Sequence, residues 1–177
     1  SINKLFKNVG MKLYDIEKIN IHGGSLRLYI KNSLNCRVTK RCEKILINEK
    51  QNLTLKTFKR FENQIYTYSS LFKKELYKLK NNKHIIIGYG APARVSTITN
   101  LSKIRSNLIK YIIDDSPLKQ NRFTPGMHIK ILPRKNNLDN KITIVIVFAY
   151  EYFRDIKKVF KNKKIMFFKP IPFSRLK

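Results

Sequence analysis

The spacing of hydrophobic residues separates a short first part of the chain from a longer second part. A helical stripe in residues 5–9 ends at Gly10, a typical helix terminator. Apolar residues then recur through residues 11–21 and alternate strictly through residues 26–30, which is typical of two strands. One helix and two antiparallel strands are too small to bury a core of their own. This pattern therefore predicts the edge of a larger, severed domain.

Residues 32–52 are polar and basic, and they predict a linker. A long amphipathic helix begins near Leu53, because apolar residues recur every three or four positions until Asn81 and Asn82 end the pattern. Its apolar positions are Phe58, Phe61, Ile65, Tyr68, Phe72, Leu76 and Leu79. We interpret this apolar face as core packing rather than as a groove for a partner helix.

The rest of the chain alternates short runs of β-branched residues with helical or loop segments. The predicted strands are residues 84–87, 108–113, 127–132, 142–148 and 165–168, and the predicted helices are residues 92–105 and 151–160. Such alternation is typical of a parallel sheet with helices on its faces. The sequence therefore predicts an α/β fold with a Rossmann-like, mainly parallel sheet, preceded by the terminal helix and the antiparallel strand pair.

Composition excludes several classes of protein. Of 177 residues, 42% are hydrophobic and 28% charged, which fits a globular protein rather than a disordered one. The longest apolar run, residues 142–150, is far shorter than the roughly 20 residues that span a bilayer, so we expect no membrane partner. The two cysteines, Cys36 and Cys42, have no partner at zinc spacing and indicate reduced structural thiols in a cytoplasmic protein.

The net charge of +27 suggests nucleic acid as a partner, since Lys and Arg neutralise phosphates. The charges are scattered along the whole chain, however, and Lys, Asn and Ile together make up more than a third of it. That bias is expected from an AT-rich genome. We therefore favour coding bias over a dedicated nucleic-acid surface.

A glycine-rich loop lies between the first predicted strand of the sheet and the helix after it. Residues 88–93 read Gly-Tyr-Gly-Ala-Pro-Ala, and backbone N–H groups at such a position can receive an anion. We favour a loop for a phosphate-bearing ligand over a purely structural turn. Asp114 and Asp115 end the next strand, where a carboxylate either holds a ribose hydroxyl or caps a turn. Both interpretations stay open.

Two cations and three histidines complete the candidate chemistry. Lys119 and Arg122 either face a diphosphate or lie in solvent. His84 and His128 lie in predicted strands, which favours structural roles, whereas His22 precedes Gly-Gly-Ser at a bend and is better placed to meet a ligand. These pieces form no Ser-His-Asp arrangement, metal cluster or carboxylate pair, so we assign no catalytic and no metal-binding residue.

Several separated runs, in order, resemble one family. They are HGGSLRLYI (22–30), GYGAPAR (88–94), DDSPLKQNRFTPGMHI (114–129), AYEYFRDI (149–156) and KPIP (169–172). They resemble the sugar-nucleotide C-methyltransferases, which use S-adenosylmethionine to methylate deoxysugar nucleotides. The chain departs from the typical family runs at Val95 and Ser96, which replace Gly-Asn, at Asn121, which replaces Gly, and at Glu151, which replaces Asn.

The resemblance implies how the chain is divided and what it lacks. Residues 1–31 resemble the tail of a methyltransferase domain, residues 32–52 a linker and residues 53–177 the C-terminal α/β domain. Ser1 stands where Met is expected, and we expect the missing N-terminal methyltransferase half to be a partner. That half would hold S-adenosylmethionine and the catalytic base. On this hypothesis the chain is a methyltransferase fragment that is inactive alone.

In the family, a base removes the proton next to the 4-keto group of a nucleotide-linked sugar, and the carbanion attacks the sulfonium methyl group. The resemblance implies that this chain forms part of the sugar-nucleotide site. The residues expected to bind substrate are His22, Ser25, Arg27, Gly88, Gly90, Ala91, Pro92, Asn100, Lys119 and Arg122. Two alternatives remain open: a Rossmann-like nucleotide-binding module without methyl transfer, and a basic nucleic-acid-binding protein.

Overall fold

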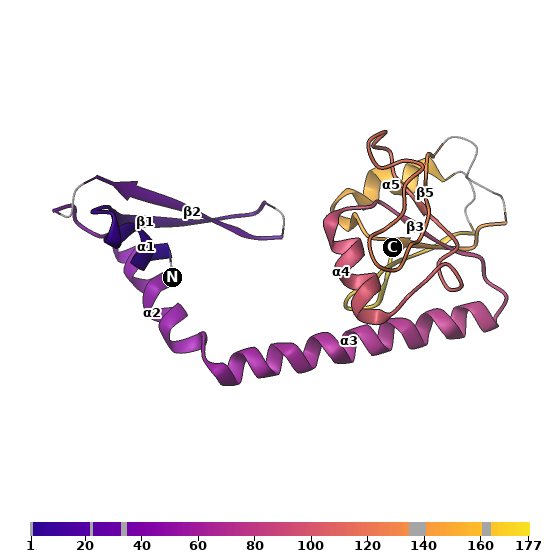
Figure 1. The fold of residues 1–177 in the computed structure, drawn as a ribbon, viewed down its shortest axis with the longest axis horizontal. Helices are drawn as coiled ribbons and strands as arrows, with labels where there is room; N and C mark the ends of the chain where they lie inside the picture. The colour runs from indigo at the N-terminus through magenta and orange to yellow at the C-terminus, as the bar shows by residue number, and fades with distance from the viewer. Residues whose placement is uncertain (1, 22, 33–34, 135–140, 161–163) are drawn as a thin grey trace. The chain divides into compact units, whose positions relative to one another are not determined.

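The computed structural model describes residues 2–21, 23–32, 35–134, 141–160 and 164–177 (Figure 1). The chain forms two compact units, Ser1–Phe61 and Glu62–Lys177. In chain order the elements are α1 (Ile2–Asn8), β1 (Lys12–Ile19), β2 (Ser25–Lys31), α2 (Lys40–Asn52), α3 (Leu55–Asn81), β3 (Ile86–Tyr89), α4 (Ala93–Ser102), β4 (Ile112–Ile113), β5 (Ile131–Leu132), β6 (Ile144–Val147), the 3-10 helix η1 (Tyr150–Tyr152), α5 (Phe153–Val159), β7 (Met166–Lys169) and β8 (Ser174–Leu176).

The N-terminal unit contains the antiparallel pair β1–β2, as the sequence predicts. Leu13 and Ile16 on β1 are buried against Cys42 of α2. The polar segment predicted as a linker, residues 32–52, therefore includes a helix that packs on the strand pair. Thr39 caps this helix, because its Oγ1 accepts a hydrogen bond from the Cys42 N–H at 3.2 Å.

The cysteines are free thiols. Cys42 is fully buried, and burial raises the pKa of its thiol. A buried thiol of raised pKa is unreactive. This agrees with a structural role for Cys42.

The C-terminal unit is built on a six-stranded sheet in the order β5-β4-β3-β6-β7-β8. Strands β3 to β7 of this sheet are parallel to one another, and β8 pairs with β7 in the antiparallel direction. The chain starts at β3 in the middle of the sheet, moves outward through β4 and β5, and returns to the other side of β3 at β6. This is the doubly wound order of Rossmann-like folds, so the predicted fold class is confirmed.

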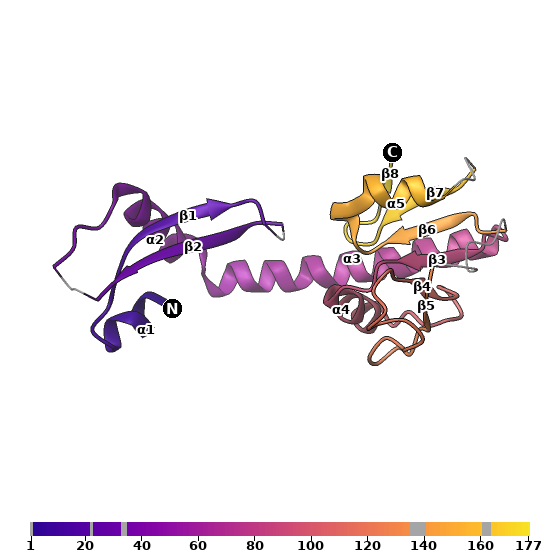
Figure 2. The ribbon, with the colours of Figure 1, turned by 90° about the horizontal axis from the view of Figure 1, so that it is seen from above.

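Helices cover both faces of this sheet (Figures 1 and 2). Because successive strand residues point to opposite faces, Ile144 and Ile146 belong to one core cluster, and Val145 and Val147 belong to the other. The first cluster includes side chains of α3 and α4, and the second includes Ile156 of α5. The sheet thus has α3 and α4 on one face and α5 on the other.

The helix α3 spans the boundary between the two compact units, which lies between Phe61 and Glu62. Phe72 and Leu76 in its second half are fully buried. Leu55, Phe58 and Phe61 in its first half are exposed. Only the second half of the apolar stripe therefore packs in a core as the sequence predicts.

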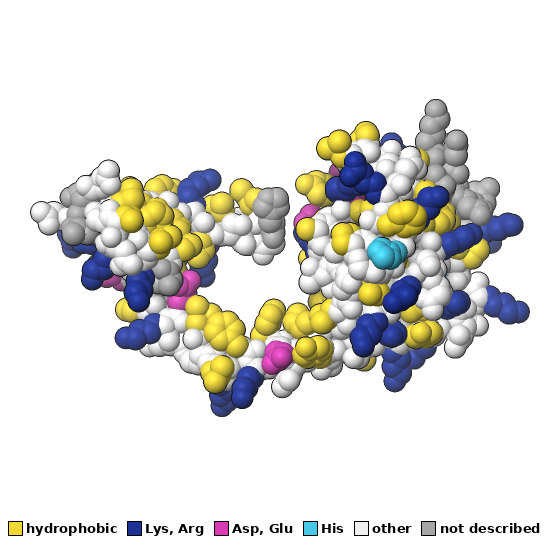
Figure 3. All heavy atoms as spheres, in the orientation of Figure 1, with side chains coloured by type: hydrophobic (Ala, Val, Ile, Leu, Met, Phe, Trp, Pro, Cys, Tyr) yellow, Lys and Arg dark blue, Asp and Glu magenta, His cyan; other side chains and the backbone are white. Residues whose placement is uncertain are grey.

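On the face drawn in Figure 3, Lys and Arg side chains of the C-terminal unit lie at several separate places rather than along one stripe. Among the described helices, none is long and apolar enough to cross a membrane.

Candidate functional site

The strand order of the sheet reverses between β3 and β6. In open α/β sheets, ligands bind beyond the carboxyl ends of the strands at such a reversal. The residues there are the glycine-rich loop, whose first two residues, Gly88 and Tyr89, are the last residues of β3, together with Asp114 and Asp115 after β4 and residues 149–151 after β6. We call these residues, together with the first turn of α4, the switch-point site.

The two glycines of the loop are required by close packing. Gly90 has a φ of +81°, and a Cβ atom on it would lie 2.5 Å from the Cβ of Ala149. A Cβ on Gly88 would lie 2.8 Å from Cγ1 of Ile112. The packing of the chain itself thus accounts for both glycines, and it brings the β3 and β6 connections into contact.

A carboxylate of the chain itself, that of Asp114, binds the backbone of the loop. Asp114 is buried, and its Oδ2 accepts a hydrogen bond from the Ala91 N–H at 2.6 Å. Its Oδ1 accepts one from the Ser116 N–H at 2.8 Å, so Asp114 also caps a turn. The expectation that the loop offers free N–H groups to a ligand is therefore wrong for Ala91, and Pro92, which precedes α4, has no N–H at all.

Asp115 is engaged as well. Its Oδ2 accepts a hydrogen bond from the Tyr89 hydroxyl at 2.9 Å, and its Oδ1 lies 3.5 Å from Nε of Arg134. Burial raises the pKa of Tyr89 above its ordinary value, and the hydrogen bond to Asp115 adds to this effect. Tyr89 is thus a neutral donor that holds the carboxylate in place.

These contacts test whether the site suits S-adenosylmethionine or a nicotinamide cofactor. In dinucleotide sites, a carboxylate after the second strand accepts the ribose hydroxyls. Here both carboxylates in that place are held by donors of the chain itself. The described residues therefore do not fit such a cofactor. Within the same residues, no group of three or more His, Cys, Asp and Glu could hold a metal ion.

An ion pair joins the two connections at the site. Nη2 of Arg94, in the first turn of α4, lies 2.6 Å from Oε1 of Glu151 in η1. The Arg94 guanidinium also lies 4.6 Å from the centre of the Tyr150 ring. Both charged side chains remain about a third exposed, at 31% and 32%. The ion pair therefore remains accessible to an anionic ligand.

Sequence reasoning missed this ion pair. Arg94 ends one of the runs quoted above, and Glu151 is a departure from the family pattern. This departure, an acid in place of a neutral residue, is the signal that could have suggested a nearby cation.

The other predicted residues of the C-terminal unit have distinct surroundings. Nζ of Lys119 lies 3.5 Å from Oδ2 of Asp114, which places this cation beside the loop. Arg122 is exposed. Asn100 donates through Nδ2 to the carbonyls of Ser96 and Pro125, so it links α4 to the turn at residues 125–127. Lys119 is thus the predicted residue whose side chain is placed beside the loop.

The predicted residues of the N-terminal unit have partners within that unit. Ser25 Oγ donates to the Ile21 carbonyl at 3.0 Å, and Nη1 of Arg27 lies 3.2 Å from Oε2 of Glu17. His22 lies outside the described residues. Their participation in one site with the glycine-rich loop stays a prediction.

The other two histidines are not at the switch point. Nδ1 of His84 lies 3.1 Å from Oγ1 of Thr143, in agreement with a structural role. His128 is exposed in a turn with a φ of +51°, so the prediction that it lies within a strand is wrong.

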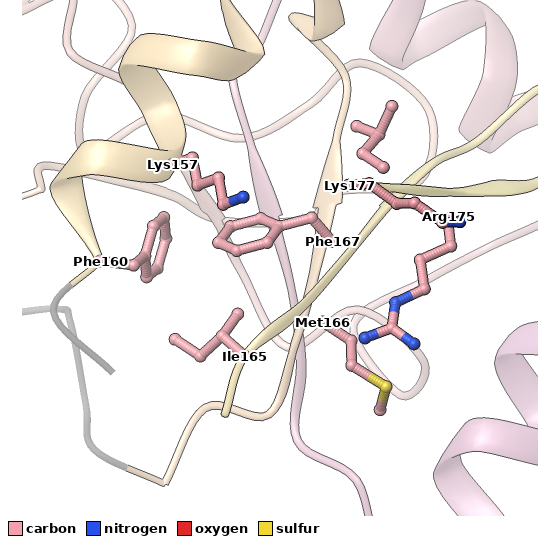
Figure 4. Close-up of a pocket in the computed structure, with 8 residues that line it drawn as sticks. Lys157, Phe160, Ile165, Met166, Phe167, Arg175 and Lys177 are labelled. Carbon is pink, nitrogen blue, oxygen red and sulfur yellow. The ribbon is translucent and has the colours of Figure 1, made fainter. Parts of the chain in front are cut away.

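A cavity of about 560 Å³ lies at the other edge of the sheet (Figure 4). Ile165 and Met166 at the amino end of β7 line it, and the rings of Phe160 and Phe167 meet there with centroids 5.5 Å apart. Because the glycine-rich loop follows the carboxyl end of the parallel strand β3, this cavity is separate from the switch-point site.

Comparison with protein families matches residues 20–172 to the family described as C-methyltransferase C-terminal domain. No curated protein matches the chain.

Proposed function

The chain belongs to the family of C-methyltransferase C-terminal domains, and on that premise we propose that it forms the substrate side of an enzyme that methylates a carbon atom of a nucleotide-linked 4-keto deoxysugar. The motif runs that resemble the sugar-nucleotide C-methyltransferases support the sugar nucleotide as substrate, because they are spread over most of the chain and occur in order. S-adenosylmethionine supplies the methyl group, and another part of the enzyme holds it.

The arrangement of Arg94 is the observation that carries this proposal. A guanidinium matches the geometry of a phosphate and binds it through two parallel hydrogen bonds. Arg94 is held over Tyr150 and stays partly exposed, so its position is set before a ligand arrives. A diphosphate group can therefore replace Glu151 as its partner.

The chain's residues then orient the substrate. Lys119 lies beside the loop and Arg122 on the same connection, so both add positive charge for the diphosphate. Gly88, Gly90, Ala91 and Pro92 shape the loop next to them, and Asn100 fixes α4. Removal of the proton next to the keto group is assigned to a base outside this chain, and the chain holds the sugar for that step.

Arg94→Ala is expected to weaken binding of thymidine diphosphate at least about tenfold, since a hydrogen bond to a charged group contributes about 1.5–3 kcal/mol. Isothermal titration calorimetry on the full chain measures this. Lys158→Ala is the matched control, because Lys158 also pairs with an acid, Asp155 at 3.0 Å, but lies on the exposed surface of α5. Equal affinities of all three proteins would contradict the proposal, and tighter binding of NADH would favour the nucleotide-binding module.

A further inference from the structure

The N-terminal unit contains a basic pocket between β1 and α2. Its volume is about 680 Å³. Its lining residues are Glu17, Lys18, Lys40, Arg41, Lys44 and Ile45. Four of these six side chains are cationic, and we call them the basic pocket residues.

The secondary structure places these cations on facing surfaces. Lys18 follows the buried Ile16 by two positions on β1, so it lies on the same face of the strand pair, which is the face covered by α2. Arg41, Lys44 and Ile45 are three and four positions apart on α2, and they therefore share one side of that helix. The strand and the helix thus direct positive charge into one pocket.

The nearby acids do not neutralise this charge in full. Glu17 accepts hydrogen bonds from the Tyr29 hydroxyl at 2.7 Å and from Arg27 at 3.2 Å, and the hydrogen bond from Tyr29 is the main cause of its lowered pKa. Asp15 is bound by Arg41 and by Thr39, whose Oγ1 lies 2.6 Å away. These hydrogen bonds, first of all that from Arg41, lower the pKa of Asp15 to about 2.

Three cations of the pocket remain without such an acid. Within the described residues, Lys18, Lys40 and Lys44 form no ion pair. Lys40 and Lys44 are one turn apart, where like charges repel, and they lie in the first half of α2, where the helix dipole also disfavours cations. An anion bound in the pocket would relieve both effects.

We propose that the basic pocket binds a compact multivalent anion, the diphosphate group. Facing cations from two elements match a ligand that carries several negative charges within a few ångströms. The pocket is one concavity rather than a continuous stripe, which favours a small anion over a nucleic acid. This inference does not rest on the proposed function, since all of its residues belong to the N-terminal unit.

Titration of the full chain with inorganic pyrophosphate at constant ionic strength tests the proposal. Lys18→Ala combined with Lys44→Ala is expected to weaken pyrophosphate binding at least about tenfold. Lys50→Ala combined with Lys59→Ala removes the same charge from exposed positions of α2 and α3 outside the pocket, and it is expected to change the affinity less than twofold. In a chain that already carries Arg94→Ala, the substitutions of Lys18 and Lys44 are expected to weaken pyrophosphate binding by the same factor, which separates the basic pocket from the switch-point site.

Competition by thymidine diphosphate identifies the source of the diphosphate group, and competition by an oligonucleotide tests for a nucleic acid. Thymidine diphosphate that competes with pyrophosphate for the unmodified chain supports a nucleotide as the source, and failure to compete supports the free anion. Equal losses in the two double variants would overturn the proposal, because they would show attraction by net charge alone. A single-stranded oligonucleotide that displaces pyrophosphate at lower concentration would overturn it as well, in favour of a nucleic acid.

Discussion

Gly90→Ala is expected to destabilise the C-terminal unit by about 3 kcal/mol. An alanine at a φ of +81° costs about 1–2 kcal/mol, because its Cβ crowds the backbone. The added methyl group would also lie 2.5 Å from the Cβ of Ala149, and overpacking of this kind costs about 1–3 kcal/mol. Hydrogen exchange of the β6 amides, measured by mass spectrometry, reports the loss as faster exchange in this unit.

Ala149→Gly in the same chain provides the control. It removes the methyl group that the new alanine would meet, so the double variant is expected to recover part of the lost stability while the cost of the positive φ remains. Additive effects of the two substitutions would contradict the close approach of the two connections at the switch-point site.

Phe72→Ala is expected to lower the free energy of unfolding of the C-terminal unit by about 3–5 kcal/mol, as other large-to-small changes of phenylalanine in cores do. Phe72 is fully buried, and its ring centroid lies 5.8 Å from that of Phe173. The substitution would leave a cavity between α3 and the sheet. Urea denaturation followed by circular dichroism measures the change.

Phe61→Ala is the matched control on the same helix. Phe61 is 60% exposed, so its removal is expected to cost less than about 1 kcal/mol. If both substitutions destabilised the unit equally, the division of α3 into an exposed first half and a packed second half would be wrong.

The α/β sheet could be predicted because its central strands lie in short apolar runs rich in β-branched residues and are buried on both faces. The run at residues 142–148 is an example, since its strand β6 is fully buried. The antiparallel strand β8 could not be predicted in this way, because Ser174 and Arg175 interrupt its apolar pattern and its position depends on pairing with β7.

The helix α2 was missed for a related reason. Its buried side is marked by Cys42, with Ile45 and Leu46 partly buried beside it, and polar or charged residues occupy nearly all the remaining positions. The packing of Cys42 against Ile16 comes from tertiary contact with β1. Composition alone therefore indicated a linker where the structure has a capped helix.

The candidate site was predicted in position but not in its contacts. The place of the glycine-rich loop follows from its position between a strand and a helix, which the sequence shows directly. The hydrogen bond from the Ala91 N–H to Asp114 joins residues 23 positions apart, and the ion pair of Arg94 with Glu151 joins residues of two separate connections. Contacts of this kind depend on strand order, which the hydrophobic pattern does not give.

A nuclear magnetic resonance titration of the full chain with thymidine diphosphate tests the central claim most directly. If the domain holds a nucleotide-linked sugar at the switch-point site, amide shifts are expected to change at Gly90, Ala91, Ala93 and Arg94 and at residues 149–151, and S-adenosylmethionine is expected to leave these amides unchanged. Shift changes at these residues with S-adenosylmethionine or NADH, and none with thymidine diphosphate, would contradict the claim.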